Sequence, residues 1–283
     1  MLTDLYPMVQ FKKDTWEIDE FDCASMFVLI GEEKAMLIDC GMGIGDLRSA
    51  VSKITDKPLV VVITHGHVDH TGNARQFEEI WIHPNDAHHP IPQDLERRRD
   101  DTQRIALREK GISPYDLMGD LREPGPDEPM PVIHHLHDGQ QFDLGGRVVT
   151  AYECFGHSPG EMIFLDEKTR SLFCGDALNY NLGIRSMSIE VAVKYLERMR
   201  DMGDRYDGIY NGHHDFRPLG APLGNDCLPN AIDLCYQLLN GTYSPVIVPS
   251  PWGPGRPDQI MVLKGRNRLG YNAEKIHEPK QAT

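Results

Sequence analysis

The sequence predicts an α/β fold, because strand-like and helix-like segments alternate along most of its 283 residues. Residues 59–63 (LVVVI) are typical of a buried strand, and the Thr-Gly-Asn at 71–73 indicates a turn toward a helix. Residues 188–202 place apolar side chains at helical spacing among charged ones, as in an amphipathic helix. A chain of this length can form one unit, residues 1–283, with a core that needs no disulfides.

The first third of the chain predicts strands joined by turns. Strand-like runs at 25–30 and 35–39 flank Gly-Glu-Glu-Lys at 31–34 and predict a hairpin. A glycine-rich stretch at 41–45 follows. The third glycine of a dinucleotide-binding loop would fall on Asp46, and no Lys-Ser/Thr pair follows as in a phosphate-binding loop. We therefore interpret this stretch as a simple turn before a helix.

Further elements follow from the same patterns. The predicted helices lie at 46–54, 73–79, 188–202 and from 230, and the predicted strands at 80–82, 148–154, 162–165, 171–174 and 260–263. The regular pattern breaks at about 84–131, where prolines surround a charged stretch at 94–110. An insertion between core elements is a natural lid or substrate wall, and a solvated helix with loops is the alternative.

Three histidines and one aspartate lie within six positions directly after the strand at 59–63. They are His65, His67, Asp69 and His70. Extended backbone directs His65 and His67 the same way, and open α/β sheets bind ligands at the carboxyl ends of their strands. Imidazole nitrogens with a carboxylate oxygen suit zinc, iron or manganese. The pattern predicts a metal centre of a hydrolytic kind at this strand end.

This His-x-His-x-Asp-His motif resembles that of the metallo-β-lactamase-fold metallohydrolases. Three later segments are similar to the family's remaining motifs, in the right order: 156–160 with His157, 173–177 with Asp176, and 210–213 with His213. The resemblance covers roughly residues 20 to 215. It implies an αββα sandwich of two mixed β-sheets flanked by helices, and we place the chain in the glyoxalase II or lactonase-like branch.

The resemblance also implies a ligand set for two divalent metal ions. One ion would be held by His65, His67 and His157, the other by Asp69, His70 and His213, with Asp176 bridging them. Zinc is favoured, while iron and manganese accept the same donors. A pair of such ions lowers the pKa of a shared water toward neutrality, so that no serine or cysteine nucleophile is needed.

Two residues are candidates for catalytic roles beside the ions. Asp69 is one, and Tyr180 is the other, because a similarly placed tyrosine contacts substrate in lactonases of the family; simple packing is the alternative for Tyr180. His214 could orient its neighbour, contact substrate or serve the structure. Ser158 fits a serine-nucleophile elbow, but Pro159 after it lacks the backbone N–H that such an oxyanion hole requires.

The resulting functional hypothesis is a dinuclear metal-dependent hydrolase that cleaves a small ester, thioester or lactone. A mononuclear iron persulfide dioxygenase is the first alternative, and a β-lactam or phosphodiester hydrolase the next. A relic of the fold that binds ligand without turnover has no chemical reason to keep all seven ligands. The expected partner is a small-molecule substrate.

Composition restricts the remaining options. A net charge of −14 argues against nucleic acid as a partner, since phosphate backbones are bound through an excess of Lys and Arg. No leader-like start or membrane-length apolar segment occurs, and the six cysteines show no C-x-x-C spacing, so we expect a cytoplasmic protein with reduced thiols and no membrane contact. The oligomeric state stays open, a homo-oligomer included. Five further histidines are expected to face the lid or the surface rather than form another metal site: His88, His89, His134, His135 and His137.

Overall fold

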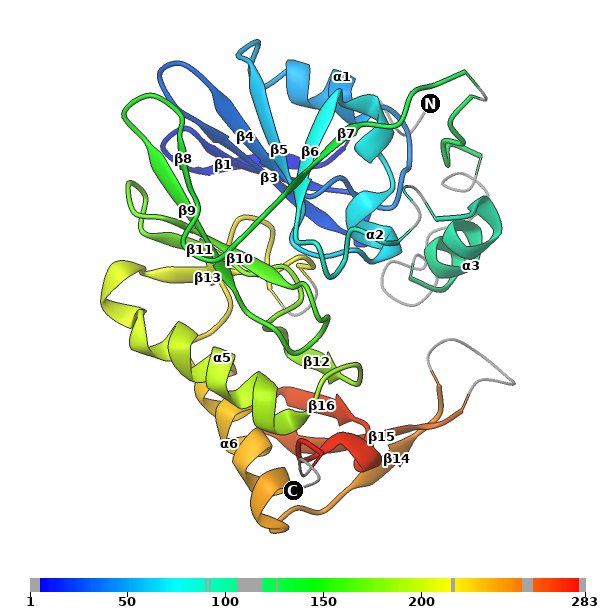
Figure 1. Ribbon diagram of the computed structural model, residues 1–283, viewed down its shortest axis with the longest axis vertical. Coiled ribbons are helices and arrows are strands. Elements are labelled where there is room, and N and C mark those ends of the chain that lie inside the picture. Colours follow the sequence, from blue (N-terminus) through cyan, green and yellow to red (C-terminus); the bar gives the residue numbers. More distant parts are fainter. Residues whose placement is uncertain are drawn as a thin grey trace.

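Two mixed β-sheets form the centre of the computed structural model, which describes residues 6–89, 91, 93–105, 119–125, 127–214, 217–250 and 257–279 (Figure 1). The first sheet has seven strands in sequence order, antiparallel from β1 to β4 and parallel from β4 to β7. Its strands are β1 Met8–Lys12, β2 Thr15–Asp19, β3 Ser25–Ile30, β4 Ala35–Ile38, β5 Leu59–Val62, β6 Glu79–Ile82 and β7 Val132–His135.

The second sheet has five strands in the order β13-β11-β10-β9-β8. These are β8 Gln141–Asp143, β9 Val148–Glu153, β10 Met162–Asp166, β11 Ser171–Phe173 and β13 Gly208–Tyr210. Since β9 and β11 are both antiparallel to β10, and β13 is parallel to β11, the strands β9, β11 and β13 run the same way. Their carboxyl ends therefore meet at one edge of the sheet.

Alternating side chains of the central strands build two separate cores. In β3, Phe27 and Leu29 face the second sheet and pack with Phe164 and Phe173. The intervening residues, Met26 and Val28, face the other way, toward the apolar side of α1. A sheet buried on both faces needs cover on its outer side, and helix α1 (Leu47–Ser52), whose first turn is capped by the Asp46 side chain, supplies part of it.

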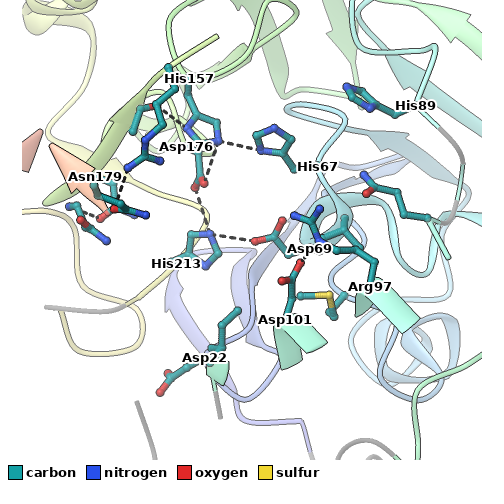
Figure 2. A pocket seen from close by; sticks show the side chains of 18 residues that line it. Asp22, His67, Asp69, His89, Arg97, Asp101, His157, Asp176, Asn179 and His213 are labelled. Carbon is teal, nitrogen blue, oxygen red and sulfur yellow. Dashed lines mark hydrogen bonds and ion pairs between the residues drawn. The ribbon is translucent and has the colours of Figure 1, made fainter. Parts of the chain in front are cut away.

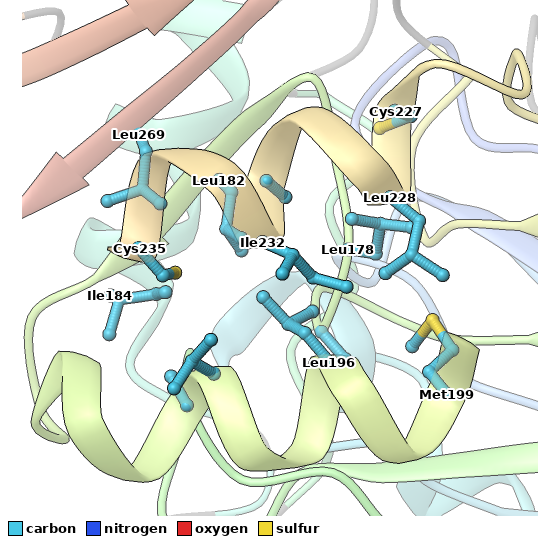
Figure 3. Packing of buried hydrophobic residues seen from close by; sticks show 14 of the residues in the cluster. Leu178, Leu182, Ile184, Leu196, Met199, Cys227, Leu228, Ile232, Cys235 and Leu269 are labelled. Carbon is cyan, nitrogen blue, oxygen red and sulfur yellow. The ribbon is translucent and has the colours of Figure 1, made fainter. Parts of the chain in front are cut away.

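Helices α5 (Ile189–Asp201) and α6 (Cys227–Asn240) cover the outer face of the second sheet. Leu196 and Met199 of α5 face Leu228 and Ile232 of α6 in Figure 3. The amphipathic pattern at 188–202 predicted α5, and the structure adds that Ser188 is its N-cap. In Figure 1, α5 and α6 lie on the opposite side of the two sheets from α1, so the predicted layers of helix, sheet, sheet and helix are confirmed.

A third, four-stranded sheet adds to the two that were predicted. Its order is β12-β16-β15-β14, and its strands are β12 Asn181–Ile184, β14 Val246–Val248, β15 Gln259–Lys264 and β16 Asn267–Tyr271. Only β15 was predicted from the sequence. Apolar side chains of this sheet, such as Leu182 and Leu269, join the core under α5 and α6.

The predicted helix at 73–79 is wrong in type and length. Residues Ala74–Gln76 form a single 3-10 turn, and β6 already begins at Glu79. A short α-helix, α2, lies instead over Val68–Thr71, within the histidine motif itself. Of the predicted insertion, the structure describes helix α3 (Leu95–Ile105) and parts of the flanking segments, while residues 106–118 lie outside the described residues. Among the described residues, further short 3-10 turns are Gly203–Arg205 and Ala273–Lys275.

The glycine-rich stretch at 41–45 is a turn around a buried carboxylate. Glu20 is fully buried, and its Oε1 accepts hydrogen bonds from the backbone N–H of Gly43 (3.1 Å) and Ile44 (2.8 Å). A third backbone N–H, that of Met42, donates to Oε2. Because these donors are already taken within the chain, they cannot cradle a phosphate, and the interpretation as a simple turn is confirmed.

Two further predictions concern the chain as a whole. All six cysteines are buried free thiols, which agrees with the expectation of reduced thiols. Within the described residues, no helix combines the length and the apolar character needed to cross a bilayer.

Candidate metal centre

Seven side chains converge where strands of both sheets end. His65 follows β5 in the first sheet, whereas His157, Asp176 and His213 follow β9, β11 and β13 in the second. The three strands of the second sheet run the same way, so their carboxyl ends bring these side chains to one edge. The prediction of a site at strand carboxyl ends therefore agrees with the geometry.

One group of three imidazoles meets at the Nδ1 atom of His67. His65 Nε2 lies 3.0 Å and His157 Nε2 2.9 Å from it. Each of these nitrogens offers a lone pair or a single proton, and three of them cannot pair with one another as ordinary hydrogen bonds. A cation at their common focus would resolve this crowding, which fits a metal ligand set.

A second group lies beside the first. His213 Nε2 is 3.5 Å from Asp69 Oδ2, and His70 Nε2 is 3.9 Å from Asp69 Oδ1. Asp176 stands between the two groups, with Oδ2 3.5 Å from His157 Nε2 and Oδ1 3.3 Å from His213 Nε2 (Figure 2). All seven residues predicted as ligands are thus brought together, and Asp176 has the central position expected for a bridge.

Protonation of these imidazoles is disfavoured in the first group. Burial, together with the neighbouring His157, lowers the pKa of His67 to about 4. Burial and the nearby His70 place the pKa of His65 well below its usual range. Neutral imidazoles keep their lone pairs for a metal. In the second group, the buried Nε2 of His70 has no hydrogen-bond partner in the described part of the chain. This nitrogen is therefore available to coordinate a cation.

Asp39 orients His70 from the end of β4. Its Oδ2 accepts a hydrogen bond from His70 Nδ1 at 2.8 Å, and its Oδ1 accepts one from the Thr64 backbone N–H at 2.7 Å. Burial opposes a charge on His70, but the carboxylates of Asp39 and Asp69 raise the pKa of His70 to about 9, so a cation bound at Nε2 would displace a proton. Asp39 has a φ of 65°, a conformation that is costly outside glycine. Its hydrogen bonds to His70 and Thr64 stabilise this conformation. They also hold the His70 ring so that Nε2 points at the centre.

Asp86 joins two ligand loops that are far apart in sequence. Its Oδ2 accepts the Gly66 backbone N–H at 3.0 Å, between His65 and His67, and the Ser158 hydroxyl at 2.6 Å, next to His157. Ser158 is buried and donates to this carboxylate, which agrees with our rejection of a serine nucleophile. Asp86 therefore sets the spacing of the first three imidazoles without touching their nitrogens.

Replacing Asp86 with alanine is expected to lower the affinity for a divalent cation about 10- to 100-fold, as loss of a residue that orients ligands commonly does. Competition with a chromogenic chelator measures this affinity. The matched control is Asn85→Ala, since Asn85 is exposed and only its Nδ2 reaches the Pro159 carbonyl oxygen at 2.9 Å. Wild-type affinity in Asp86→Ala would contradict the role assigned to Asp86.

The loop that carries His213 is held in place by ion pairs between side chains. Arg217 donates to both carboxylate oxygens of Glu17, at 2.7 Å and 3.1 Å, and through Nε to Asn211 Oδ1 at 2.7 Å. His214 lies with Nε2 3.0 Å from Asp19 Oδ1 and 2.6 Å from Asp22 Oδ1. Burial alone would lower its pKa, but these aspartates raise the pKa of His214 to about 10. Of its predicted roles, the structural one fits this ion pair.

A cavity of about 500 Å³ opens over the centre. Figure 2 shows its labelled walls, with His157, Asp176 and Asn179 on one side and Arg97 and Asp101 of α3 on the other. The ring centroid of His89, a histidine of the predicted insertion, lies 6.4 Å from that of His67. Residues of α3, of β12 and the position after it, and of β15 also line the cavity, namely Ile105, Asn181, Gly183, Arg185 and Gln259.

Tyr180 is not brought to this cavity. The residue is fully buried, and its hydroxyl donates to Asp226 Oδ1 at 2.7 Å, next to Arg266. The substrate role predicted for Tyr180 therefore does not fit its placement, and the preceding residue, Asn179, lines the cavity instead. The spacing from Asp176 correctly predicted that this segment comes near the cavity, but it did not predict which side chain points into it.

The family relationship follows from comparison with known proteins. The model of the family described as the metallo-beta-lactamase superfamily matches residues 18–216. The chain belongs to this superfamily. A solved structure, a metallo-beta-lactamase from Pontibacter korlensis, superposes with a TM-score of 0.56 at 16% identity, over 81% of this chain and 98% of that one. This likeness agrees with the fold.

Two curated relatives of the chain are thioesterases by name. The human "acyl-coenzyme A thioesterase MBLAC2" is 26% identical over 175 residues, covering 55% of this chain and 58% of the relative. The "atrochrysone carboxyl ACP thioesterase" of Aspergillus fumigatus is 26% identical over 174 residues, covering 59% of this chain and 31% of the relative. The chain thus spans less than two thirds of either relative.

Proposed function

We propose that this protein is a metal-dependent hydrolase that cleaves thioesters of small acyl groups. The observation that carries the proposal is the convergence of seven residues with nitrogen and oxygen donors, five of which line one cavity. Thioesters are preferred over oxygen esters and lactones because two relatives within the superfamily carry thioesterase names. The names of these relatives favour a thioesterase over the glyoxalase II or lactonase-like branch that the sequence suggested.

In this proposal, two divalent cations occupy the centre, with zinc favoured over iron and manganese. His65, His67 and His157 would hold one, and Asp69, His70 and His213 the other, with Asp176 between them. Bound there, the cations would supply an activated water and polarise the scissile carbonyl. The completeness of the second group favours a dinuclear hydrolase over a mononuclear dioxygenase, which needs only the first.

The protein's own side chains have separate tasks around that water. Asp69 lines the cavity, so its carboxylate can accept a hydrogen bond from the attacking water and take up its proton. Asp39 and Asp86 hold the ligand loops in place through the hydrogen bonds described above. We propose that α3, within the insertion at 84–131, forms a wall that confines a compact substrate, since Arg97, Asp101 and Ile105 face the cavity.

Hydrolysis of a substrate panel by zinc-loaded protein tests this function. The panel holds acetyl- and butyryl-coenzyme A, an oxygen ester, a lactone, a β-lactam and a phosphodiester. At least one thioester is expected to be cleaved with a kcat/KM of about 10⁴ M⁻¹ s⁻¹ or more. Chelation should abolish the activity, and added zinc should restore it. Absence of thioester turnover at a full metal complement would refute the proposal, and oxygen uptake on a persulfide with one iron per chain would favour the dioxygenase.

A further inference from the structure

Arg185 lies across a floor made by two paired glycines. Gly183 of β12 and Gly270 of β16 are direct partners in the parallel pairing of these strands. A Cβ atom added at Gly270 would come within 2.5 Å of Arg185 Nη2, and one at Gly183 within 3.0 Å of Nη1. Glycine inside a strand weakens it and often marks a close approach by another group. Here the group that takes up the space is the guanidinium of Arg185.

This floor adjoins the candidate metal centre. The carbonyl oxygen of Gly183 lies 2.9 Å from His157 Nδ1. The same Cβ position at Gly183 that lies 3.0 Å from Arg185 Nη1 is 3.8 Å from His157 Nδ1. The guanidinium and the imidazole therefore both border the same small residue. A group bound by Arg185 would be only a few bonds from a carbonyl held at the centre.

Arg185 differs from the other arginine of the cavity wall in its partners. Arg97 Nε lies 2.6 Å from Asp101 Oδ2, so its charge is compensated. For Arg185 the structure shows one hydrogen bond, from Nη2 to the neutral Gln259 Oε1 at 2.9 Å, and no carboxylate within 4.0 Å among the residues described. Burial lowers its pKa, yet a guanidinium remains charged at any physiological pH.

An arginine that has no carboxylate partner among the described residues of a substrate cavity can bind an anionic group of the substrate. A planar guanidinium matches a carboxylate through two parallel N–H···O bonds. The neighbouring wall residues Asn179 and Asn181 carry no charge. They can add hydrogen bonds, but they cannot select a charged substrate over a neutral one of equal shape.

We propose that Arg185 is the specificity residue of this cavity and binds a carboxylate that the substrate carries a few bonds from its scissile carbonyl. This inference rests on the proposed thioesterase function and deepens it. The carboxylate could end a short acyl chain, as in a succinyl thioester, or belong to the thiol half of the substrate. The chemistry toward Arg185 is the same in both cases.

Four small thioesters distinguish these sources. Succinyl-N-acetylcysteamine carries the charge on its acyl half, and the acetyl thioester of 3-mercaptopropionate carries it on its thiol half. Their neutral counterparts are the methyl ester of succinyl-N-acetylcysteamine, with its free carboxyl group esterified, and the acetyl thioester of methyl 3-mercaptopropionate. The wild type is expected to prefer one charged member over its neutral counterpart by about tenfold or more in kcat/KM, mainly through KM.

The variant Arg185→Gln is expected to remove that preference, lowering kcat/KM about tenfold more for the charged compound than for its neutral counterpart. Arg185→Lys should restore part of it, since lysine keeps the charge without the planar geometry. The matched control is Arg200→Gln, an exposed arginine of α5 outside the cavity. No preference in the wild type, or an equal loss on charged and neutral substrates in Arg185→Gln, would overturn the inference.

A binding measurement separates this inference from the proposed function. NMR titration of the metal-loaded protein with monomethyl succinate, and with neutral dimethyl succinate, requires no turnover. Preferential binding of the monoanion that is lost in Arg185→Gln would support the anion site even if every thioester failed as a substrate. Binding of the monoanion that is equal in wild type and Arg185→Gln would overturn the site even if thioesters were cleaved.

Discussion

Replacing His67 with alanine is expected to reduce thioester hydrolysis at least about 10³-fold, because metal-ion catalysis supplies several kcal/mol of transition-state stabilisation. His67 Nδ1 lies within 3.0 Å of both His65 Nε2 and His157 Nε2, so it is the common point of the first ligand group. Without it, this ion would keep only His65, His157 and the shared carboxylate of Asp176, so it should bind less tightly. Elemental analysis should show at least one metal ion fewer per chain than in the wild type.

The matched control for His67→Ala is His89→Ala. His89 lines the same cavity but belongs to no group of potential metal ligands within the described residues. This variant should keep the wild-type metal content, whatever its effect on substrate binding. Wild-type activity and metal content in His67→Ala would show that the candidate centre is assigned to the wrong residues.

Replacing Arg217 with glutamine is expected to lower the free energy of unfolding by about 3–5 kcal/mol, because it leaves Glu17 buried without its counter-charge. Both side chains of this pair are almost completely buried. The change also removes the hydrogen bond to Asn211, which precedes His213 by two residues. The affinity for the second cation should therefore fall as well. Denaturant unfolding at saturating zinc measures the first effect, and chelator competition the second.

Arg147→Gln provides the comparison that separates the two effects. Arg147 and Asp166 form a similarly buried ion pair, with Nη2 2.6 Å from Oδ2, at the other end of strand β10 from the metal centre. This variant should lose comparable stability but keep wild-type metal affinity. An equal loss of metal affinity in both variants would mean that general destabilisation, and not the His213 loop, is responsible.

Much of the candidate centre could be predicted because its information is local. The strand at 59–63 and the histidines after it are contiguous, and each later ligand follows its own short strand. The structure brings all seven together as the resemblance implied. The amphipathic helix at 188–202 could be predicted for the same reason, since apolar periodicity is a property of one segment.

The supporting residues could not be predicted, because they act across long separations in sequence. Asp86 bridges loops near residues 66 and 158, and a single aspartate in a turn carries no pattern that indicates this. Glu161 is similar, for its Oε1 accepts the Asp176 backbone N–H at 3.0 Å and lies 3.5 Å from His65 Nδ1. Asp39 is only weakly indicated by the sequence, as an acidic residue at the end of a strand-like run. The third sheet was missed because its strands β12 and β14 are short and lack clear alternation.

The distribution of the seven donors over both sheets has a consequence for the life of the protein. Segments that follow strands of the first sheet supply four of them, and segments of the second sheet supply three. Bound ions would therefore cross-link the two halves of the sandwich. A ligand that binds only the folded chain stabilises it by about 2.7 kcal/mol when its free concentration is 100 times its Kd. Scarcity of the metal would then increase both unfolding and exposure to proteases, and the abundance of the protein would follow the metal supply of its surroundings.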